Sequence, residues 1–289
     1  FSLTYDRPVG METTRVGRAV FYGFVPDAPI RPVAVFAGAH DGYPAKENNE
    51  GTNMGAIDTI RARHSVREYL GKPIGGVQLA GLRHAIIEAE QKSGLDIQLV
   101  MDNPEVFQVV ARFGLVRGAT ASIVFCADGK DADEAIGYWG QRIVLTAQEL
   151  GLNTCWCALC SRKKSKAVLR GDKKVRIVIA VGLGKTQGSN RKTKPLGELC
   201  TVEGGSMANG ASDAGARALP SWFATAMEAA QLAPTAMNAQ NFHITLRADG
   251  KTVAARATKE GAWSAIDLGI VRRNFEEAAN ETGADWRWE

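Results

Sequence analysis

Apolar residues recur with regular periods along most of the chain after residue 53, and these periods predict its elements. A spacing of three to four residues over 77–91 and 131–150 indicates amphipathic helices. Alternation over 96–101 and a β-branched run over 175–181 indicate strands. The same criteria predict further helices over 56–69, 221–232 and 266–282 and further strands over 121–126, 243–247 and 251–257.

Two stretches interrupt the periodic pattern and divide the chain. Residues 1–53 hold five of the ten prolines, and we expect an irregular N-terminal extension there. Residues 202–218 are rich in Gly, Ala and Ser, which is typical of a flexible linker. The pattern therefore predicts a first half over 54–201 and a second half over 219–289.

Composition narrows the class of protein. Hydrophobic residues make up 45% and charged residues 23%, as in ordinary globular domains, which argues against intrinsic disorder. The net charge of +4 is too small to indicate a nucleic-acid binder by itself. No apolar run is long enough to predict a transmembrane helix. The five cysteines are an odd number and no secretory leader is recognisable, so we expect a cytoplasmic protein.

The two halves share short similarities. Residues 147–151 resemble 279–283 at an offset of 132, and residues 86–91 resemble 226–231 at an offset of 140. The first offset also relates Trp156 to Trp288 and Gly137 to Gly269. These matches indicate either an internal duplication or chance similarity between helical segments.

Two motifs suggest phosphate or metal binding but fail on spacing. Gly182-Leu-Gly-Lys-Thr186 lacks a P-loop glycine at Ile179 and a dinucleotide-binding glycine at Gln187, which leaves a tight turn after a strand. In Cys155-Trp-Cys-Ala-Leu-Cys160 only the last two cysteines have zinc-ligand spacing, so buried thiols are the favoured interpretation and no metal site is expected.

Arg63-His-Ser-Val-Arg67 is a candidate anion site. On the predicted helix, Arg63 and Arg67 are four residues apart and share a face, where two guanidinium groups and the Ser65 hydroxyl could bind a phosphate. A solvated basic face is the alternative.

The segment Ala233-Pro-Thr-Ala-Met-Asn-Ala-Gln-Asn-Phe242 ends a predicted helix at Pro234. Thr235, Asn238 and Gln240 then supply polar groups that could bind the edge of a planar ring. Ordinary turn chemistry is the alternative.

Together with Gly151-Leu-Asn-Thr-Cys-Trp156, these motifs resemble the nitroreductase family. The family carries Arg-x-Ser-x-Arg or Lys, Ala-Pro-Ser-x-x-Asn-x-Gln-Pro-Trp and Gly-Leu-Gly-Thr-x-Trp. The resemblance covers about 54–289 and implies an α+β fold with a central, mostly antiparallel sheet flanked by helices. Family members are FMN-dependent homodimers. Asn241 replaces the usual proline and Leu183 a usual tyrosine, which bears on the shape of the substrate pocket.

The order of the motifs departs from the family. The Asn-x-Gln motif, expected near Glu88–Gly94, is absent there and occurs in the second half. In the family dimer this motif reaches the flavin from the opposite subunit. The resemblance therefore implies a tandem pseudo-dimer within one chain, with one complete flavin site, and we expect a monomer.

The resemblance also assigns roles to individual residues. The residues implied in FMN binding are Arg63, His64, Ser65, Arg67, Asn153, Thr154, Cys155, Lys185, Arg191, Pro234, Thr235, Asn238 and Gln240. Arg63, Ser65 and Arg67 match the phosphate and pyrimidine motif, whereas Lys185 and Arg191 are alternative phosphate ligands. No catalytic side chain is required, because the flavin carries the chemistry.

The implied function is an FMN-dependent NAD(P)H oxidoreductase that reduces a small acceptor, such as a nitroaromatic or a quinone. We expect no nucleic-acid or membrane partner. One alternative is a flavin-binding protein without turnover. The other is a binder of nucleic acid or anions, because residues 162–194 hold twelve Lys or Arg and a single acid, Asp172.

Overall fold

The computed structural model describes residues 54–204 and 219–289. The predicted extension over 1–53 lies outside the described residues, as does most of the predicted linker over 202–218. All described residues fall in a single unit of the chain. Within them, no helix is long and apolar enough to cross a membrane.

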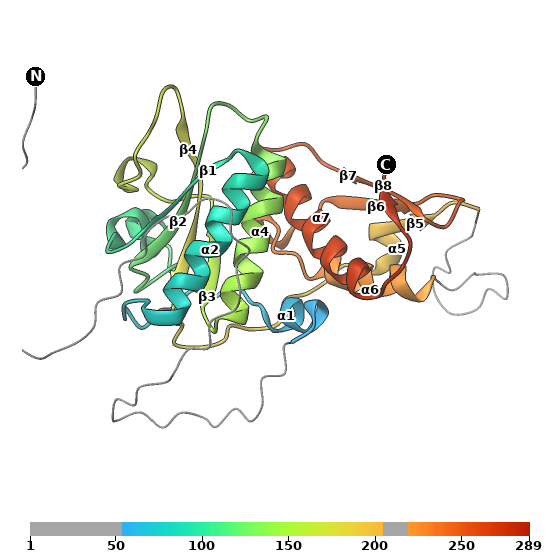
Figure 1. Cartoon of the computed structure of the whole chain (residues 1–289), viewed down its shortest axis with the longest axis horizontal. Helices are drawn as coiled ribbons and strands as arrows, with labels where there is room; N and C mark the ends of the chain where they lie inside the picture. The colour runs from blue at the N-terminus through green and yellow to red at the C-terminus, as the bar shows by residue number, and fades with distance from the viewer. Residues whose placement is uncertain (1–53, 205–218) are drawn as a thin grey trace, which may run out of the picture. The chain divides into compact units, whose positions relative to one another are not determined.

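The first sheet has four antiparallel strands in the order β1-β2-β4-β3 (Figure 1). The central strands β2 and β4 are buried along almost their whole length, which explains why their sequences are continuous apolar runs. The strands are β1 Asp96–Val100, β2 Ala121–Ala127, β3 Asn153–Cys157 and β4 Lys174–Gly182. The strands predicted over 96–101, 121–126 and 175–181 are confirmed.

Helical segments cover both faces of this sheet. On one face, α2 (Gly76–Ser93) and α4 (Asp133–Glu149) pack in a cluster that includes Phe125 of β2. On the other, η1 (Pro104–Phe107) and α3 (Gln108–Arg112) pack in a cluster that includes Val124. Neighbouring residues of a strand point to opposite faces, so Val124 and Phe125 enter different clusters. The short η1–α3 segment has no period from which it could be predicted.

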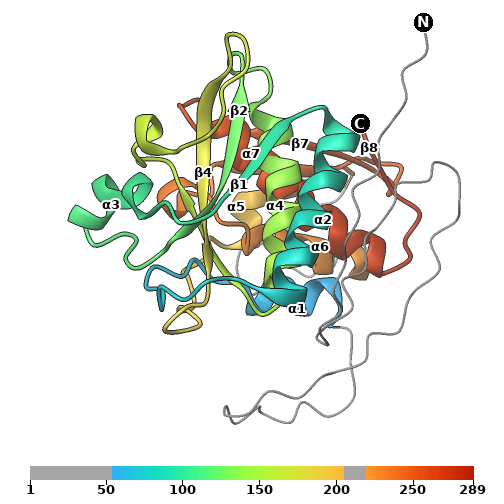
Figure 2. The same cartoon turned by 60° about the vertical axis from the view of Figure 1, so that its left-hand side comes forward.

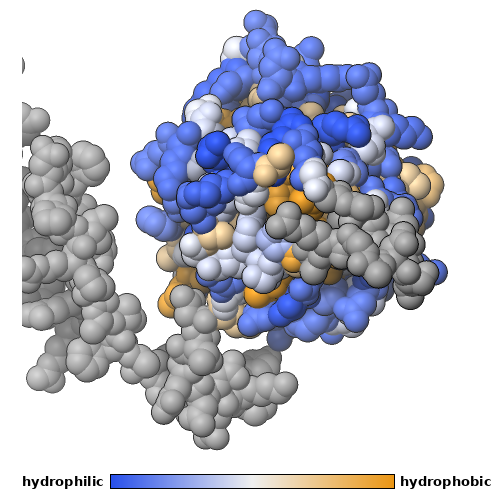
Figure 3. All heavy atoms as spheres, turned by 90° about the vertical axis from the view of Figure 1, so that its right-hand side faces the viewer, coloured by the Kyte–Doolittle hydropathy of each residue, from blue (hydrophilic) through white to orange (hydrophobic). Residues whose placement is uncertain are grey.

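The second sheet is mixed and combines strands from both halves. Its order is β5-β6-β7-β8, with parallel β5–β6 and β7–β8 pairs and an antiparallel β6–β7 pair. Its strands are β5 Cys200–Val202, β6 Phe242–Leu246, β7 Thr252–Ala257 and β8 Arg287–Trp288. Helix α5 (Leu196–Leu199) precedes β5 in the chain, and α6 (Ser221–Gln231) precedes β6. Figure 3, viewed from this side, shows mainly hydrophilic residues around a small apolar area.

This second sheet differs from the mostly antiparallel sheet that the resemblance implies. The second half forms its own β6–β7 hairpin, and the free backbone groups along the edge of β6 pair with β5 from the first half. The first sheet alone matches the expected antiparallel arrangement.

Helices α4 and α7 (Ser264–Glu281) lie side by side in Figures 1 and 2 and join the two halves. Gly137 and Gly269 lie at their contact, where a Cβ at either position would come within 2.0 Å of a carbonyl oxygen of the other helix. Buried Gln141 donates from Nε2 to Oδ1 of Asn274 at 2.9 Å. One hydrophobic cluster includes residues of α2, α4, α7 and β6, so the halves share a core.

The helix predicted over 56–69 is too long. Helix α1 spans Ala56–Ala62, and the next residue, Arg63, has extended backbone angles. The Val66 N–H donates to the Thr154 carbonyl of β3 at 3.0 Å, which replaces a helical hydrogen bond with one to the sheet edge. Arg63 and Arg67 therefore do not share a helical face, and that part of the prediction is wrong.

Candidate functional site

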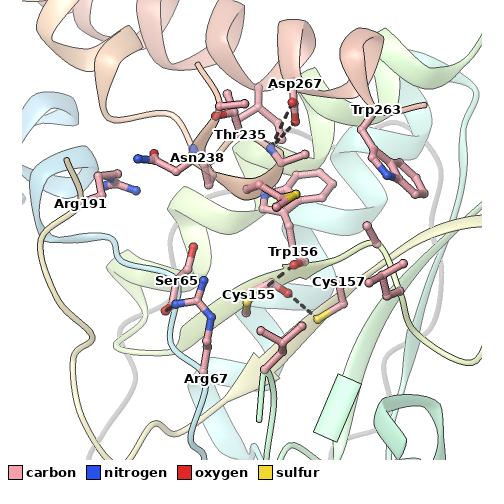
Figure 4. A pocket seen from close by; sticks show the side chains of 18 of the residues that line it. Ser65, Arg67, Cys155, Trp156, Cys157, Arg191, Thr235, Asn238, Trp263 and Asp267 are labelled. Atoms are coloured by element: carbon pink, nitrogen blue, oxygen red, sulfur yellow. Dashed lines mark hydrogen bonds between the residues drawn. The ribbon is translucent and has the colours of Figure 1, made fainter. Parts of the chain in front are cut away.

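A cavity of about 850 Å³ receives side chains from both halves of the chain (Figure 4). The first half contributes Ser65, Arg67, the segments 155–159 and 189–192, and residues near α3. The second half contributes the segment 234–239 and Trp263, Ile266, Asp267 and Ile270 at the start of α7. The cavity is large enough for a cofactor-sized ligand.

The cavity is basic where Arg191 lines it. The Arg191 Nη2 donates to the backbone carbonyl of Arg63 at 3.0 Å. Burial lowers the pKa of Arg191 to about 10. The Arg63 side chain is 1% exposed and does not line the cavity. Among the described residues, Nε and Nη2 of Arg63 and Nε of Arg191 have no hydrogen-bond partner. Buried guanidinium groups are normally paired, so this region fits an anion such as a phosphate group.

Strand β3 and the segment after α1 form a second wall. Figure 4 shows Ser65 and Arg67 on the same side as Arg191, with Cys155 beside Arg67 and Cys157 on the other side of Cys155. A hydrogen bond from the Cys157 thiol lowers the pKa of the Cys155 thiol, and the nearby Arg67 guanidinium acts in the same direction. All five cysteines are buried. Within 54–204 and 219–289, no cluster of three or more His, Cys, Asp or Glu side chains could hold a metal ion.

The turn after α6 forms the opposite wall and is conformationally strained. Met237, Asn238 and Gln240 have φ values of 53°, 54° and 49°, which L-residues rarely adopt. Asn238 donates from Nδ2 to the Lys192 carbonyl at 2.8 Å. Gln240 donates to the same carbonyl at 3.1 Å and accepts from the Lys194 N–H at 2.9 Å. These bonds hold the strained turn against the loop that carries Arg191, and strain of this kind concentrates at functional sites.

The start of α7 forms the remaining wall, with Trp263 on the far side of the cavity from Arg191 in Figure 4. The Ala236 N–H donates to Oδ1 of Asp267 at 2.9 Å, which ties η3 (Ala236–Asn238) to this helix. Burial raises the pKa of Asp267 to about 6. Sequence reasoning missed these residues. The sequence does contain a signal for them: Trp263, Asp267 and Ile270 follow one another at intervals of four and three residues, which places them on one face of a helix. A carboxyl group on an otherwise apolar helix face is unusual and could have marked Asp267 as a site residue.

Comparison with known proteins decides the family. The family model described as "Putative TM nitroreductase" matches residues 56–279. The chain belongs to this nitroreductase family. No curated protein matches the sequence.

Solved structures of nitroreductases resemble this chain. A crystal structure described as "a putative nitroreductase" from Thermotoga maritima MSB8 has a TM-score of 0.55 and 20% identity, and the match covers 83% of this chain and 90% of that one. It shows that the fold is nitroreductase-like. A protein from Desulfovibrio desulfuricans in complex with FMN has a TM-score of 0.41 and 23% identity over 51% of this chain and 95% of that one. An FMN-dependent nitroreductase from Clostridium difficile has a TM-score of 0.38 and 20% identity over 50% of this chain and 94% of that one.

The nitroreductase motif residues fall into two groups in the structure. Seven of the residues expected from the sequence line the cavity: Ser65, Arg67, Cys155, Arg191, Pro234, Thr235 and Asn238. The other six, Arg63, His64, Asn153, Thr154, Lys185 and Gln240, do not line it.

Most of the second group supports the walls of this nitroreductase site. Asn153 accepts from the Gly184 N–H at 2.9 Å, and Thr154 accepts from Val66. His64 contacts Oδ1 of Asn190 through Nε2 at 3.0 Å. Lys185 is exposed, so between the two alternative phosphate ligands the geometry favours Arg191.

The raised pKa of Asp267 predicts that the free energy of unfolding depends on pH. Because its pKa rises from 3.8 to about 6 on folding, its stabilising effect is complete below about pH 4 and is lost as the pH rises through 6. Asp267→Asn keeps an oxygen for the Ala236 N–H and removes the buried charge. We expect the variant to be about 1–3 kcal/mol more stable than wild type at pH 8 and equally stable at pH 4.

Urea unfolding of both proteins at the two pH values measures this difference. Asp128→Asn, at an exposed position, controls for the loss of a negative charge. A stability difference that is the same at pH 4 and pH 8 would contradict the prediction.

Proposed function

We propose that this protein is an FMN-dependent NAD(P)H oxidoreductase that passes electrons to a small acceptor, such as a nitroaromatic or a quinone. One observation carries the proposal: motifs from both halves border one cavity, and that cavity has unpaired buried guanidinium nitrogens beside it. The first motif supplies Ser65 and Arg67, and the second supplies Thr235 and Asn238. When bound, FMN supplies hydride transfer between a nicotinamide and the acceptor.

Specific residues would hold the cofactor. Arg191, which lines the cavity and has an unpaired Nε, would bind its phosphate. Arg63, whose backbone carbonyl accepts from Arg191, would add positive charge behind it. The Arg67 guanidinium would stabilise negative charge on the reduced ring. Asn238 would border the flavin ring from the second half of the chain. Gln240 would act indirectly by fixing the turn, because its side-chain amide is hydrogen-bonded to residues 192 and 194.

We also propose that the chain is a pseudo-dimer of two nitroreductase-like halves. Apart from the inserted η1 and α3 between β1 and β2, and η3 between α6 and β6, the element order α2-β1-β2-α4-β3 of the first half recurs as α6-β6-β7-α7-β8 in the second. The second half lacks a counterpart of β4. In the first sheet, β4 lies between β2 and β3 and is antiparallel to both, so β2 and β3 run in the same direction. Removing such a strand would leave its neighbours as a parallel pair, which is the pairing of β7 with β8.

The contact between α4 and α7 supports the same proposal. A Cβ on Gly137 would meet the carbonyl of Ile266, three residues before Gly269. A Cβ on Gly269 would meet the carbonyl of Glu134, three residues before Gly137. This reciprocity is the pattern of a two-fold interface, in which the same surfaces face each other.

Cofactor content tests the function. We expect the purified chain, incubated with FMN and desalted, to retain one FMN per monomer and to bleach on anaerobic addition of NADH or NADPH. Arg191→Ala should weaken FMN binding about ten- to a hundredfold, the effect of one charge-assisted contact. Lys185→Ala serves as the matched control and should leave binding unchanged.

The possible failures are distinguishable. Absence of FMN binding would overturn the proposed function. Two tightly bound FMN per chain would leave the function intact and overturn the pseudo-dimer with a single complete site. Bound FMN that neither nicotinamide reduces would favour a flavin-binding protein without turnover.

A further inference from the structure

Large apolar side chains are exposed on residues that line the cavity or lie next to its lining in the chain. Phe113 is 71% exposed, Leu159 is 60% exposed and Met237 is fully exposed. Leu159 and Met237 line the cavity, and Phe113 directly follows α3, which contributes Val110 to the same wall. Figure 2 shows α3 at the edge of the molecule. Exposed apolar residues that gather at one cavity indicate an interaction surface.

Exposed basic residues stand beside these apolar ones. Arg112 ends α3, and η2 (Arg162–Lys164) follows Leu159 in the chain. The two segments are adjacent, because Lys164 donates from Nζ to Oε1 of Gln108 in α3 at 2.6 Å. The Arg162 guanidinium lies 5.7 Å from the Trp263 ring, which lines the cavity. The mouth surface is defined here as Arg112, Phe113, Leu159, Arg162, Lys163 and Met237.

We propose that the mouth surface docks on a membrane of anionic phospholipid. Phe113, Leu159 and Met237 would enter the boundary between headgroups and acyl chains, while the basic residues contact phosphate groups. This proposal replaces the sequence-based expectation of no membrane partner. An apolar acceptor dissolved in the bilayer would then have direct access to the cavity, a consequence that rests on the proposed oxidoreductase function.

Charge and chemistry select this occupant over two others. A second copy of the chain would place Arg112, Arg162 and Lys163 against the same cations, which disfavours self-association. A nucleic acid would need a continuous basic stripe. The basic run over 162–194 does not provide one, because Arg176 pairs with Asp133 at 2.7 Å and Lys173 pairs with Asp96 at 3.2 Å. Exposed apolar side chains next to basic side chains fit the surface of a lipid bilayer instead.

Sedimentation with vesicles tests the proposal on the full-length protein. We expect binding to vesicles of equal parts phosphatidylglycerol and phosphatidylcholine, and much weaker binding to phosphatidylcholine alone. Phe113→Ser and Lys163→Glu should each lower the partition coefficient about tenfold. Ile87→Ser and Arg83→Glu are matched controls, because both positions are exposed on α2, across the first sheet from α3.

Several results would overturn the proposal: no binding to the anionic vesicles, equal binding to both vesicle types, or equal effects of the test and control variants. Displacement by duplex RNA with no effect of Phe113→Ser would identify a polyanion-binding surface instead. FMN content measured on the same samples separates this proposal from the proposed function, because vesicle binding does not require the cofactor.

Discussion

Replacing Arg63 with methionine is expected to stabilise the cofactor-free protein and to weaken FMN binding. The Arg63 side chain is almost fully buried, and two of its nitrogens have no partner within the described residues. Removing an unpaired buried charge should raise the free energy of unfolding of the apoprotein by about 1–3 kcal/mol. Losing the positive charge behind Arg191 should weaken FMN binding about three- to tenfold.

Thermal unfolding with and without FMN, together with fluorescence titration of the flavin, measures both effects. Arg61→Met is the matched control, because Arg61 is exposed on the preceding helix and pairs with Glu228 at 2.8 Å. That variant should change stability by no more than about 1 kcal/mol and leave FMN affinity unchanged. If Arg63→Met destabilises the apoprotein and leaves FMN binding intact, Arg63 is a structural residue that does not contribute to phosphate binding.

Gly137→Ala is expected to destabilise the protein strongly, because Gly137 lies where α4 and α7 are in contact. The added Cβ would lie 2.0 Å from the Ile266 carbonyl oxygen, which is backbone and cannot rotate away. Helices α4 and α7 would have to separate, at a cost of about 2–4 kcal/mol despite the better helix propensity of alanine. Because both helices border the core between the halves, FMN retention should fall as well.

Chemical unfolding of the variant checks this expectation. Gly261→Ala is the control, since a Cβ there meets only the Ser264 hydroxyl, at 3.4 Å, and its effect should stay within about 0.5 kcal/mol. Gly269→Ala should behave like Gly137→Ala, because its Cβ would meet the Glu134 carbonyl at the same distance. A mild effect at both positions would show that the helices can move apart at little cost.

Elements with a clear periodicity of apolar residues were predictable from the sequence. Short elements, and segments whose hydrogen-bond partners lie far away in the chain, were not. Helix α4 and strand β4 match their predicted ranges to within two residues at each end, because their burial patterns follow directly from the spacing of apolar residues. The segment after Ala62 was predicted as helix because its local pattern permits one. Its backbone instead pairs with Thr154 and Arg117, partners some fifty to ninety residues away that no local pattern reveals.

The candidate site divides in the same way. Sequence motifs identified Ser65, Arg67, Arg191 and Asn238, all of which line the cavity. They did not identify Trp263 or Asp267, because nothing in the local sequence says that the start of α7 faces the first half.

The sequence predicted the main helices and strands and the two motifs that meet at the cavity, and its motifs indicated the nitroreductase family. Only the folded chain shows that Gln240 supports a strained turn and that Lys185 is exposed and does not line the cavity. It also shows that β5 joins the sheet of the other half. Motifs show which chemical groups are present, whereas hydrogen-bond partners and helix contacts arise between segments far apart in the chain. Those partners exist only once α4 and α7 have packed together.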